Sequence, residues 1–204
     1  MSEIIGRGAE AILYKKGDIL IKERIKKGYR IDEIDEKLRL QRTKIESRIM
    51  LRARRHGINV PNVIKTKDYK IFMEFINGKR LKEFLNKTTS FKRKEISKEI
   101  GRNIGILHSA GIVHGDLTTS NMILKEKNNK IYFIDFGLAF HSLSVEDRAI
   151  DLHLLHQAYQ STHFKYIEGL WTSTLEGYKE MFEDWKNVLS RLKQIRKRGR
   201  YSKR

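Results

Sequence analysis

The chain has 204 residues, 39% of them hydrophobic, which is enough to bury the core of one domain or of two tightly packed lobes. Its formal net charge of +18 predicts attraction to polyanions such as nucleic acid. The absence of cysteine excludes disulfides, thiolate metal sites and cysteine nucleophiles. The sequence shows no apolar run of about eighteen residues and no secretory signal, so we expect a cytoplasmic protein without a membrane span.

The first part of the chain alternates short apolar runs with turn residues, which predicts strands. The third run is Ile19–Lys22, and it follows a turn at residues 16–18. A glycine-containing segment separates the first two runs, although Ala11 replaces the third glycine of a G-x-G-x-x-G pattern. When this segment is read alone, a plain turn is the better explanation. Because glycines let backbone N–H groups approach phosphates, the candidate nucleotide-binding loop is Ile5, Gly6, Arg7, Gly8, Ala9, Glu10 and Ala11.

A long charged helix is predicted for residues 32–55. Its expected apolar stripe is Ile34, Leu38, Ile45 and Ile49, with Met50 as a further candidate. Lys22 is the candidate ligand of nucleotide phosphates, and Glu46 on this helix is its candidate catalytic partner. An isolated glutamate among arginines is otherwise a weak surface ion pair, so Glu33 and Glu36 remain alternative partners.

The middle of the chain predicts a junction between two lobes. Residues 63–75 alternate as a hairpin, and helical spacing follows over 81–85 and 96–107. We expect the backbone groups of Glu74 and Ile76, at the junction, to bond the adenine edge of a nucleotide. An ordinary strand end would have the same sequence.

Two acidic motifs carry the strongest functional signal. Residues 114–121 read His-Gly-Asp-Leu-Thr-Thr-Ser-Asn, and Asp135 opens an Asp-Phe-Gly tripeptide beyond a further apolar run. This layout is typical of the catalytic and metal loops of the protein-kinase fold. Asp116 is therefore the candidate base or hydroxyl-orienting group, and we expect His114 to brace its loop. Asn121 and Asp135 are the candidate ligands of Mg²⁺, with ATP as the nucleotide.

The rest of the chain is predicted to be helical and to end in a basic block. Helical spacing covers residues 145–159 and then about 170–195, and its histidines, such as His156 and His163, are expected to be ordinary surface or helix residues. Residues 191–204 contain eight Lys or Arg and no Asp or Glu, which indicates a solvated tail or a phosphate-backbone contact. The candidate nucleic-acid-binding residues are Arg196, Lys197, Arg198, Arg200, Lys203 and Arg204.

These patterns predict an α+β chain with a minimal two-lobed protein-kinase-like fold. A β-rich N-lobe with one long helix is expected over residues 1–76, and a reduced helical C-lobe over 77–190. The basic residues 191–204 would form a C-terminal tail of this single domain.

The chain resembles the small atypical kinase subunit of the KEOPS complex, also called EKC, in its archaeal form. The resemblance is carried by residues 6–11, 22–30, 114–121, 134–138, 146–152 and the basic end. It implies a minimal kinase with Mg-ATP in its cleft that acts as an ATPase, with autophosphorylation or Ser/Thr kinase activity in isolation. It also implies binding to other KEOPS subunits, above all the Kae1-type subunit that makes threonylcarbamoyladenosine at position 37 of tRNA. The basic end is implied to approach the tRNA.

Departures from ordinary protein kinases agree with this resemblance. Gly115 stands where the arginine of His-Arg-Asp would read a phosphate on the activation loop, so such control is expected to be absent. No Ala-Pro-Glu follows the Asp-Phe-Gly segment, and the only proline is Pro61. Asp151 is a candidate for bracing the catalytic loop from a helix.

Two other functions remain open. One is a small-molecule phosphotransferase, because His-Gly-Asp also occurs in aminoglycoside and choline kinases, which need an added substrate-binding insert. The other is a catalytically silent scaffold that binds tRNA and a partner. The full set of candidate catalytic residues favours an enzyme, whose phosphoryl acceptor is either a protein or water.

Overall fold

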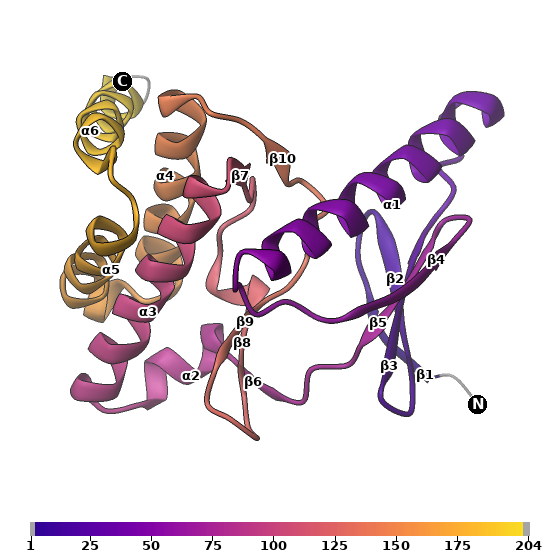
Figure 1. Ribbon diagram of the computed structural model, residues 1–204, viewed down its shortest axis with the longest axis horizontal. Helices are drawn as coiled ribbons and strands as arrows, with labels where there is room; N and C mark the ends of the chain where they lie inside the picture. Colours follow the sequence, from indigo (N-terminus) through magenta and orange to yellow (C-terminus); the bar gives the residue numbers. More distant parts are fainter. Residues whose placement is uncertain (1–2, 202–204) are drawn as a thin grey trace.

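The computed structural model describes residues 3–201, with side chains as far as residue 198. These residues form two lobes, one built on a five-stranded sheet and the other mainly on helices (Figure 1). The sheet has the order β1-β2-β3-β5-β4 and is antiparallel throughout. The predicted fold class is confirmed. The strands of this sheet are β1 (Glu3–Arg7), β2 (Ala11–Lys16), β3 (Ile19–Arg24), β4 (Val63–Lys67) and β5 (Lys70–Glu74).

Helix α1 (Asp32–Arg55) lies across the N-lobe sheet (Figure 1). Its first turn is acidic and its last turn is basic, which complements the helix dipole, and Gly57 follows it with a φ of 85°. The predicted bounds are therefore right, but the predicted apolar stripe is right only at its C-terminal end, where Met50 is buried and Ile49 packs against the core. Ile34 and Ile45 are 52% and 40% exposed, because the helix turns a mainly polar face inward toward charged partners. The buried residues of α1 are Asp35, Thr43, Glu46, Ser47, Met50 and Ala53.

The C-lobe is a group of helices around an apolar core that continues into the N-lobe. Ser144 caps α4 by accepting hydrogen bonds from the N–H groups of Glu146 and Asp147, and Thr89 caps α3 in the same way. Searched over the described residues, no helix is long and apolar enough to cross a bilayer. The helices are α2 (Leu81–Lys87), α3 (Ser90–Ser109), α4 (Val145–Thr162), α5 (Ile167–Met181) and α6 (Trp185–Tyr201).

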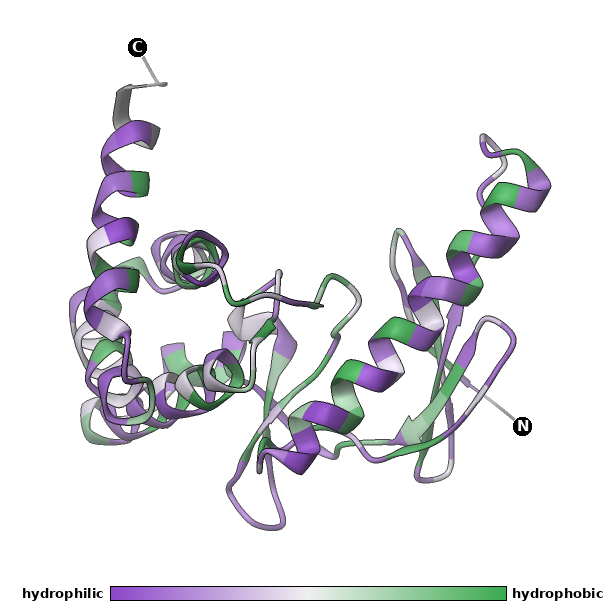
Figure 2. Ribbon diagram, turned by 45° about the horizontal axis from the view of Figure 1, so that its top comes forward, coloured by the Kyte–Doolittle hydropathy of each residue, from purple (hydrophilic) through white to green (hydrophobic). Residues whose placement is uncertain are grey.

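The C-terminal part differs from its prediction in two respects. Helical structure was expected over about 170–195, but the chain is extended at Phe182, whose buried side chain packs on His108 and Tyr178. The basic segment was expected to be a tail, yet it continues α6 as far as Tyr201, and Leu192 on this helix is only 3% exposed. Figure 2 shows that hydrophilic residues nevertheless dominate α6, as they dominate α1.

Two small sheets carry the acidic motifs. The pair of β7 (Ile112–Val113) and β10 (Phe140–His141) and the three strands β6, β8 and β9 flank them. The chain runs from β7 through the His-Gly-Asp segment to β8, and from β9 through Asp-Phe-Gly to β10. The larger of the two sheets consists of β6 (Gly78–Arg80), β8 (Met122–Lys125) and β9 (Ile131–Phe133).

Candidate active site

A buried carboxylate of α4 holds the catalytic loop in place. Asp151 is 1% exposed, and its oxygens accept hydrogen bonds from the N–H groups of His114 (2.8 Å) and Gly115 (2.9 Å). His108 also contacts Asp151, at 3.2 Å, and bonds the hydroxyl of Tyr178 on α5 at 2.9 Å. The loop backbone is thus tied to three helices through one carboxylate.

Gly115 is required by the backbone of this loop. Its φ is 75°, and a Cβ atom at this position would collide with the carbonyl oxygen of Leu138. A residue with a side chain would therefore be strained in this left-handed conformation and would also clash. The arginine of His-Arg-Asp has no room in this backbone arrangement.

His163 is a second brace of the catalytic loop, and it was wrongly predicted to be an ordinary surface or helix histidine. It is 1% exposed, and its ring nitrogens bond the hydroxyl of Thr119 (2.9 Å) and the side chain of Asn86 (2.6 Å). Burial, followed by the nearby Arg93, lowers the pKa of His163 to about 4, so the ring is neutral at pH 7. Its partner Thr119 lies 44 residues away, and no spacing pattern in the sequence reveals such a contact.

Asp116 and Asn121 lie together at the mouth of the loop. The side-chain N–H group of Asn121 donates to the carboxylate of Asp116 (2.8 Å) and to its backbone carbonyl (3.0 Å). This fixes the carboxylate of Asp116 and leaves the amide oxygen of Asn121 to act as a hard ligand.

Asp135 faces the same site from the Asp-Phe-Gly segment. Its φ is 63°, and its carboxylate accepts from Gly137 N–H (3.2 Å) and from Lys22 Nζ (2.5 Å). Burial alone would raise the pKa of Asp135, but the ammonium of Lys22 holds it below its ordinary value. Asp135 is therefore an ionised carboxylate, as a metal ligand must be.

Lys22 and Glu46 form a buried ion pair. Lys22 Nζ lies 2.7 Å from a carboxylate oxygen of Glu46, and the two residues are 8% and 1% exposed. Burial lowers the pKa of Lys22, but the carboxylates of Glu46 and Asp135 more than offset this and raise it. The alternative partners are placed elsewhere, because Glu36 accepts from the hydroxyl of Tyr69 and Glu33 is exposed.

The candidate nucleotide residues line one cleft of about 550 Å³, a volume typical of small-molecule sites. The glycine-containing loop Ile5–Ala11 forms one wall, and Glu74 and Ile76 lie at the junction of the lobes. Arg24 also lines this cleft, although no sequence pattern singled it out. The catalytic and metal candidates in the cleft are Lys22, Glu46, Asp116, Asn121 and Asp135.

The donor set fits a nucleotide-bound metal rather than a preformed metal cage. Within residues 3–198, no three His, Cys, Asp or Glu side chains are grouped closely enough to hold a metal ion. Asn121 and Asp135 would instead contribute two hard oxygen ligands, and phosphate oxygens would complete the coordination. The residues present therefore fit a hard divalent cation bound together with a nucleotide.

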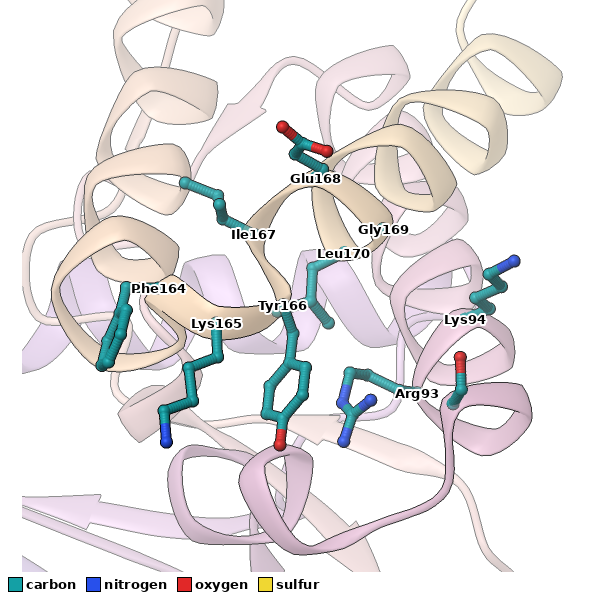
Figure 3. Close-up of a pocket in the computed structure, with 10 residues that line it drawn as sticks. Arg93, Lys94, Phe164, Lys165, Tyr166, Ile167, Glu168, Gly169 and Leu170 are labelled. Atoms are coloured by element: carbon teal, nitrogen blue, oxygen red, sulfur yellow. The ribbon is translucent and has the colours of Figure 1, made fainter.

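A second hollow of about 420 Å³ lies between the first turn of α3 and the start of α5 (Figure 3). Its centre is the guanidinium of Arg93, which stacks on the ring of Tyr166 at 3.6 Å. Arg93 also donates to the carbonyls of Leu85 and Thr88, so it links α2 to α3. This hollow shares no lining residue with the nucleotide cleft.

The candidate nucleic-acid residues lie outside the cleft, on α6. Lys197 and Arg198 are exposed, whereas Arg196 is half-buried and faces α4, where its charge contributes to lowering the pKa of His156. His156, predicted to be ordinary, is only 4% exposed and packs on Trp171. The side chain of Arg200 and residues Lys203 and Arg204 lie outside the described part.

The lobes and the cleft define a kinase-like fold with a candidate site for a nucleotide and a metal. The same fold occurs in the structure of WaaP in complex with acyl carrier protein, with a TM-score of 0.65 over 97% of this chain and 88% of that chain, at 13% identity. The RIO domain family matches residues 14–151, which supports a kinase-type phosphotransferase or ATPase activity in general.

Curated relatives narrow this class. The chain is 47% identical to the KEOPS complex subunit Bud32 of Pyrococcus abyssi, over 99% of this chain and 97% of the relative. It is 39% identical to the EKC/KEOPS complex subunit bud32 of Dictyostelium discoideum, over 97% of this chain and 82% of that protein. It is 41% identical to a probable bifunctional tRNA threonylcarbamoyladenosine biosynthesis protein of Methanosarcina barkeri, over 99% of this chain but 36% of that protein. The chain belongs to the RIO-domain family that includes the Bud32 subunits.

Proposed function

We propose that this chain is the Mg-ATP-dependent kinase or ATPase subunit of a KEOPS-type complex and supports the formation of threonylcarbamoyladenosine at position 37 of tRNA. The observation that carries the chemistry is the convergence of Lys22, Glu46, Asp116, Asn121 and Asp135 on one cleft. The near full-length match to a KEOPS subunit supports the biological role.

Each of these five side chains would have a defined role in phosphoryl transfer. Lys22, oriented by Glu46, would hold the α- and β-phosphates of ATP, and Asn121 and Asp135 would hold Mg²⁺. When bound, magnesium would neutralise part of the negative charge on the phosphates. Asp116, fixed by Asn121, would orient the hydroxyl that attacks the γ-phosphate and accept its proton.

The adenine base would lie at the junction of the lobes. Glu74 and Ile76 would bond its edge through their backbone groups, while the side chain of Glu74 is held by Lys125 at 2.5 Å. The loop Ile5–Ala11 would cover the phosphates. Within this loop Glu10 pairs with Arg42 of α1 at 2.9 Å, which ties the loop to the helix that carries Glu46.

The phosphoryl acceptor is either water or a serine or threonine hydroxyl, of this chain or of a partner. The left-handed backbone at Gly115, which admits no side chain, supports a site without the arginine that reads activation-loop phosphorylation. Control of turnover would then come from binding partners rather than from phosphorylation of this segment.

The partners follow from the relatives. The bifunctional proteins are much longer than this chain, which spans 36% of the Methanosarcina barkeri protein. A kinase-like unit fused to a second unit supports a physical interaction of this chain with a separate Kae1-type subunit, and with the other KEOPS subunits and tRNA. A net charge of +18 suits an assembly that holds tRNA.

The test is ATP hydrolysis by the purified chain, measured with and without tRNA and the Kae1-type partner. We expect turnover that requires Mg²⁺ and rises when both are present. Turnover that ignores both would favour a small-molecule phosphotransferase. Failure of the wild-type chain to hydrolyse ATP in the complete mixture would favour a silent scaffold.

A further inference from the structure

Arg24 is, beside Lys22, a second buried cation in the cleft, and neither the candidate site residues nor the proposed phosphate contacts include it. It is the last residue of β3, two positions after Lys22, so both side chains leave the strand on the same face. Arg24 is 5% exposed and lines the cleft. A buried arginine in this position needs a physical reason, since arginine keeps its charge in every protein environment.

The partner of Arg24 is the same carboxylate that orients Lys22. One oxygen of Glu46 accepts from Arg24 at 2.5 Å, and the other accepts from Lys22 at 2.7 Å. Glu46 is 1% exposed, so these two cations replace the water it would otherwise bind. Lys22 also lies 2.5 Å from Asp135, and therefore serves two carboxylates at once.

We expect Lys22 and Arg24 to change their contacts differently when a nucleotide binds. Lys22 would turn to the phosphates and Asp135 to the metal. Without Arg24, the buried carboxylate of Glu46 would have Lys22 as its sole cation and would compete with the phosphates for it. Arg24 leaves Glu46 with a second cation, one carried by a strand of the central sheet.

The way α1 packs on the sheet supports a structural role for the contact between Arg24 and Glu46. The helix turns Glu46 and other polar side chains inward, while Ile34 and Ile45 remain exposed. The middle of α1 is thus attached to the sheet through charge as well as through apolar packing. The contact from Arg24 to Glu46 joins the helix to β3 at this point.

We propose that Arg24 is a positioning residue that holds Glu46, and with it α1, in the cleft independently of the nucleotide, so that Lys22 is free to bind phosphate. This proposal rests on the proposed function. It goes further in naming the residue that keeps Glu46 and α1 in place when no nucleotide is bound. Such a residue suits a chain whose Gly115 leaves no room for the arginine that reads activation-loop phosphorylation.

The test is a double-mutant cycle of Arg24→Met and Glu46→Gln, read by kcat and by KM for Mg-ATP. We expect Arg24→Met to raise KM about tenfold with a smaller change in kcat, because Glu46 then competes with phosphate for Lys22. In the Glu46→Gln background the same change should alter KM by less than about twofold. Arg24→Lys should restore part of the lost affinity, and Arg48→Met, which removes an exposed arginine from α1, is the matched control.

An equal loss in both backgrounds would overturn the proposal, since Arg24 would then act on the nucleotide itself. An unchanged KM in Arg24→Met would overturn it as well. If Arg24→Met does not fold, Arg24→Gln provides the same comparison, with Arg24→Lys again as the variant that keeps the cation.

Hydrogen exchange of the α1 amides over residues 43–50, without nucleotide, gives a reading that does not depend on turnover. We expect faster exchange in Arg24→Met than in wild type or in Arg48→Met. Unchanged exchange contradicts the role of Arg24 even in a chain that hydrolyses ATP. Faster exchange in a chain without ATPase activity would instead refute the proposed function alone.

Discussion

Gly115 shows how one residue limits the regulation of the whole site. Its left-handed backbone places two consecutive N–H groups, of His114 and Gly115, on the carboxylate of Asp151. The carbonyl of Leu138 occupies the space where its side chain would start. The same geometry that fixes the catalytic loop therefore excludes an arginine at this position, and we expect the usual response to a phosphorylated activation segment to be absent.

We expect the buried ring of His163 to make stability depend on pH. The pKa of His163 in the folded chain is about 4, below its value of 6.5 in the unfolded chain. The unfolded chain therefore binds more protons between these pH values, and stability is full above pH 6.5 and falls as the pH drops toward 4. We expect His163 to contribute a slope of about 1.4 kcal/mol per pH unit in this window.

Urea unfolding of wild type and His163→Gln between pH 7 and 4.5 measures this contribution. The variant should lose some stability at pH 7 and show a shallower decline toward low pH. His56→Gln, at an exposed position, is the control and should follow wild type. An identical slope in wild type and His163→Gln would show that His163 is not held neutral by burial.

At the scale of single elements, the bounds of α1 could be predicted but its buried face could not. The acidic first turn, the basic last turn and Gly57 are local signals. The inward orientation of Glu46 depends on Lys22 and Arg24, which lie 24 and 22 residues away on another element. A pattern of hydrophobic spacing cannot detect a helix that is held by ion pairs.

In the candidate site, too, some residues could be predicted from the sequence and others could not. Asp116, Asn121 and Asp135 could be proposed from their spacing in short motifs next to strand-like runs. Arg24 and His163 could not, because each acts through long-range contacts and belongs to no local pattern. The break near Phe182 was missed as well, since the aromatic residues on both sides of it continue a helical spacing.

The contact between α3 and α5 gives a prediction at the same scale. The helices approach so closely that a Cβ on Gly101 would collide with the carbonyl of Thr174, and one on Gly177 would collide with the carbonyl of Lys98. We expect Gly101→Ala to destabilise the chain by about 1–3 kcal/mol, because the helices must separate.

Thermal or denaturant unfolding measures this cost. Gly169→Ala is the matched control within α5, because a Cβ there meets no atom within 4 Å. It should stabilise the chain by roughly 0.5–1 kcal/mol through helix propensity. A stabilising Gly101→Ala would contradict the close packing.

At the scale of the whole molecule, charge is distributed over surfaces that the cleft does not use. Helix α6 lies on the outer side of the C-lobe, away from the N-lobe (Figure 1), and Lys197 and Arg198 on it are exposed. The nucleotide cleft is nearly balanced in charge, with Lys22 and Arg24 facing Glu46 and Asp135. Binding of tRNA and binding of ATP are thus expected on separate surfaces.

Replacing Lys197 and Arg198 together by glutamine should weaken tRNA binding without changing the KM for ATP. Each lost phosphate contact lowers the slope of log K against log salt by about 1. Titrations at several salt concentrations measure this slope, and Lys127→Gln with Lys130→Gln, at exposed positions of the β8–β9 hairpin, provides a charge-matched control. Equal slopes for both double variants would contradict a contact between α6 and the phosphates of tRNA.

The most direct test of the central claim is Mg²⁺-dependent ATP hydrolysis by Asp135→Asn. Asparagine tolerates the left-handed backbone at this position, where φ is 63°, and removes only the charge. We predict that turnover falls by about 100-fold or more, while the melting temperature and tRNA affinity stay close to those of wild type. Undiminished hydrolysis by a folded Asp135→Asn chain would contradict the assignment of this cleft as the site of phosphoryl transfer.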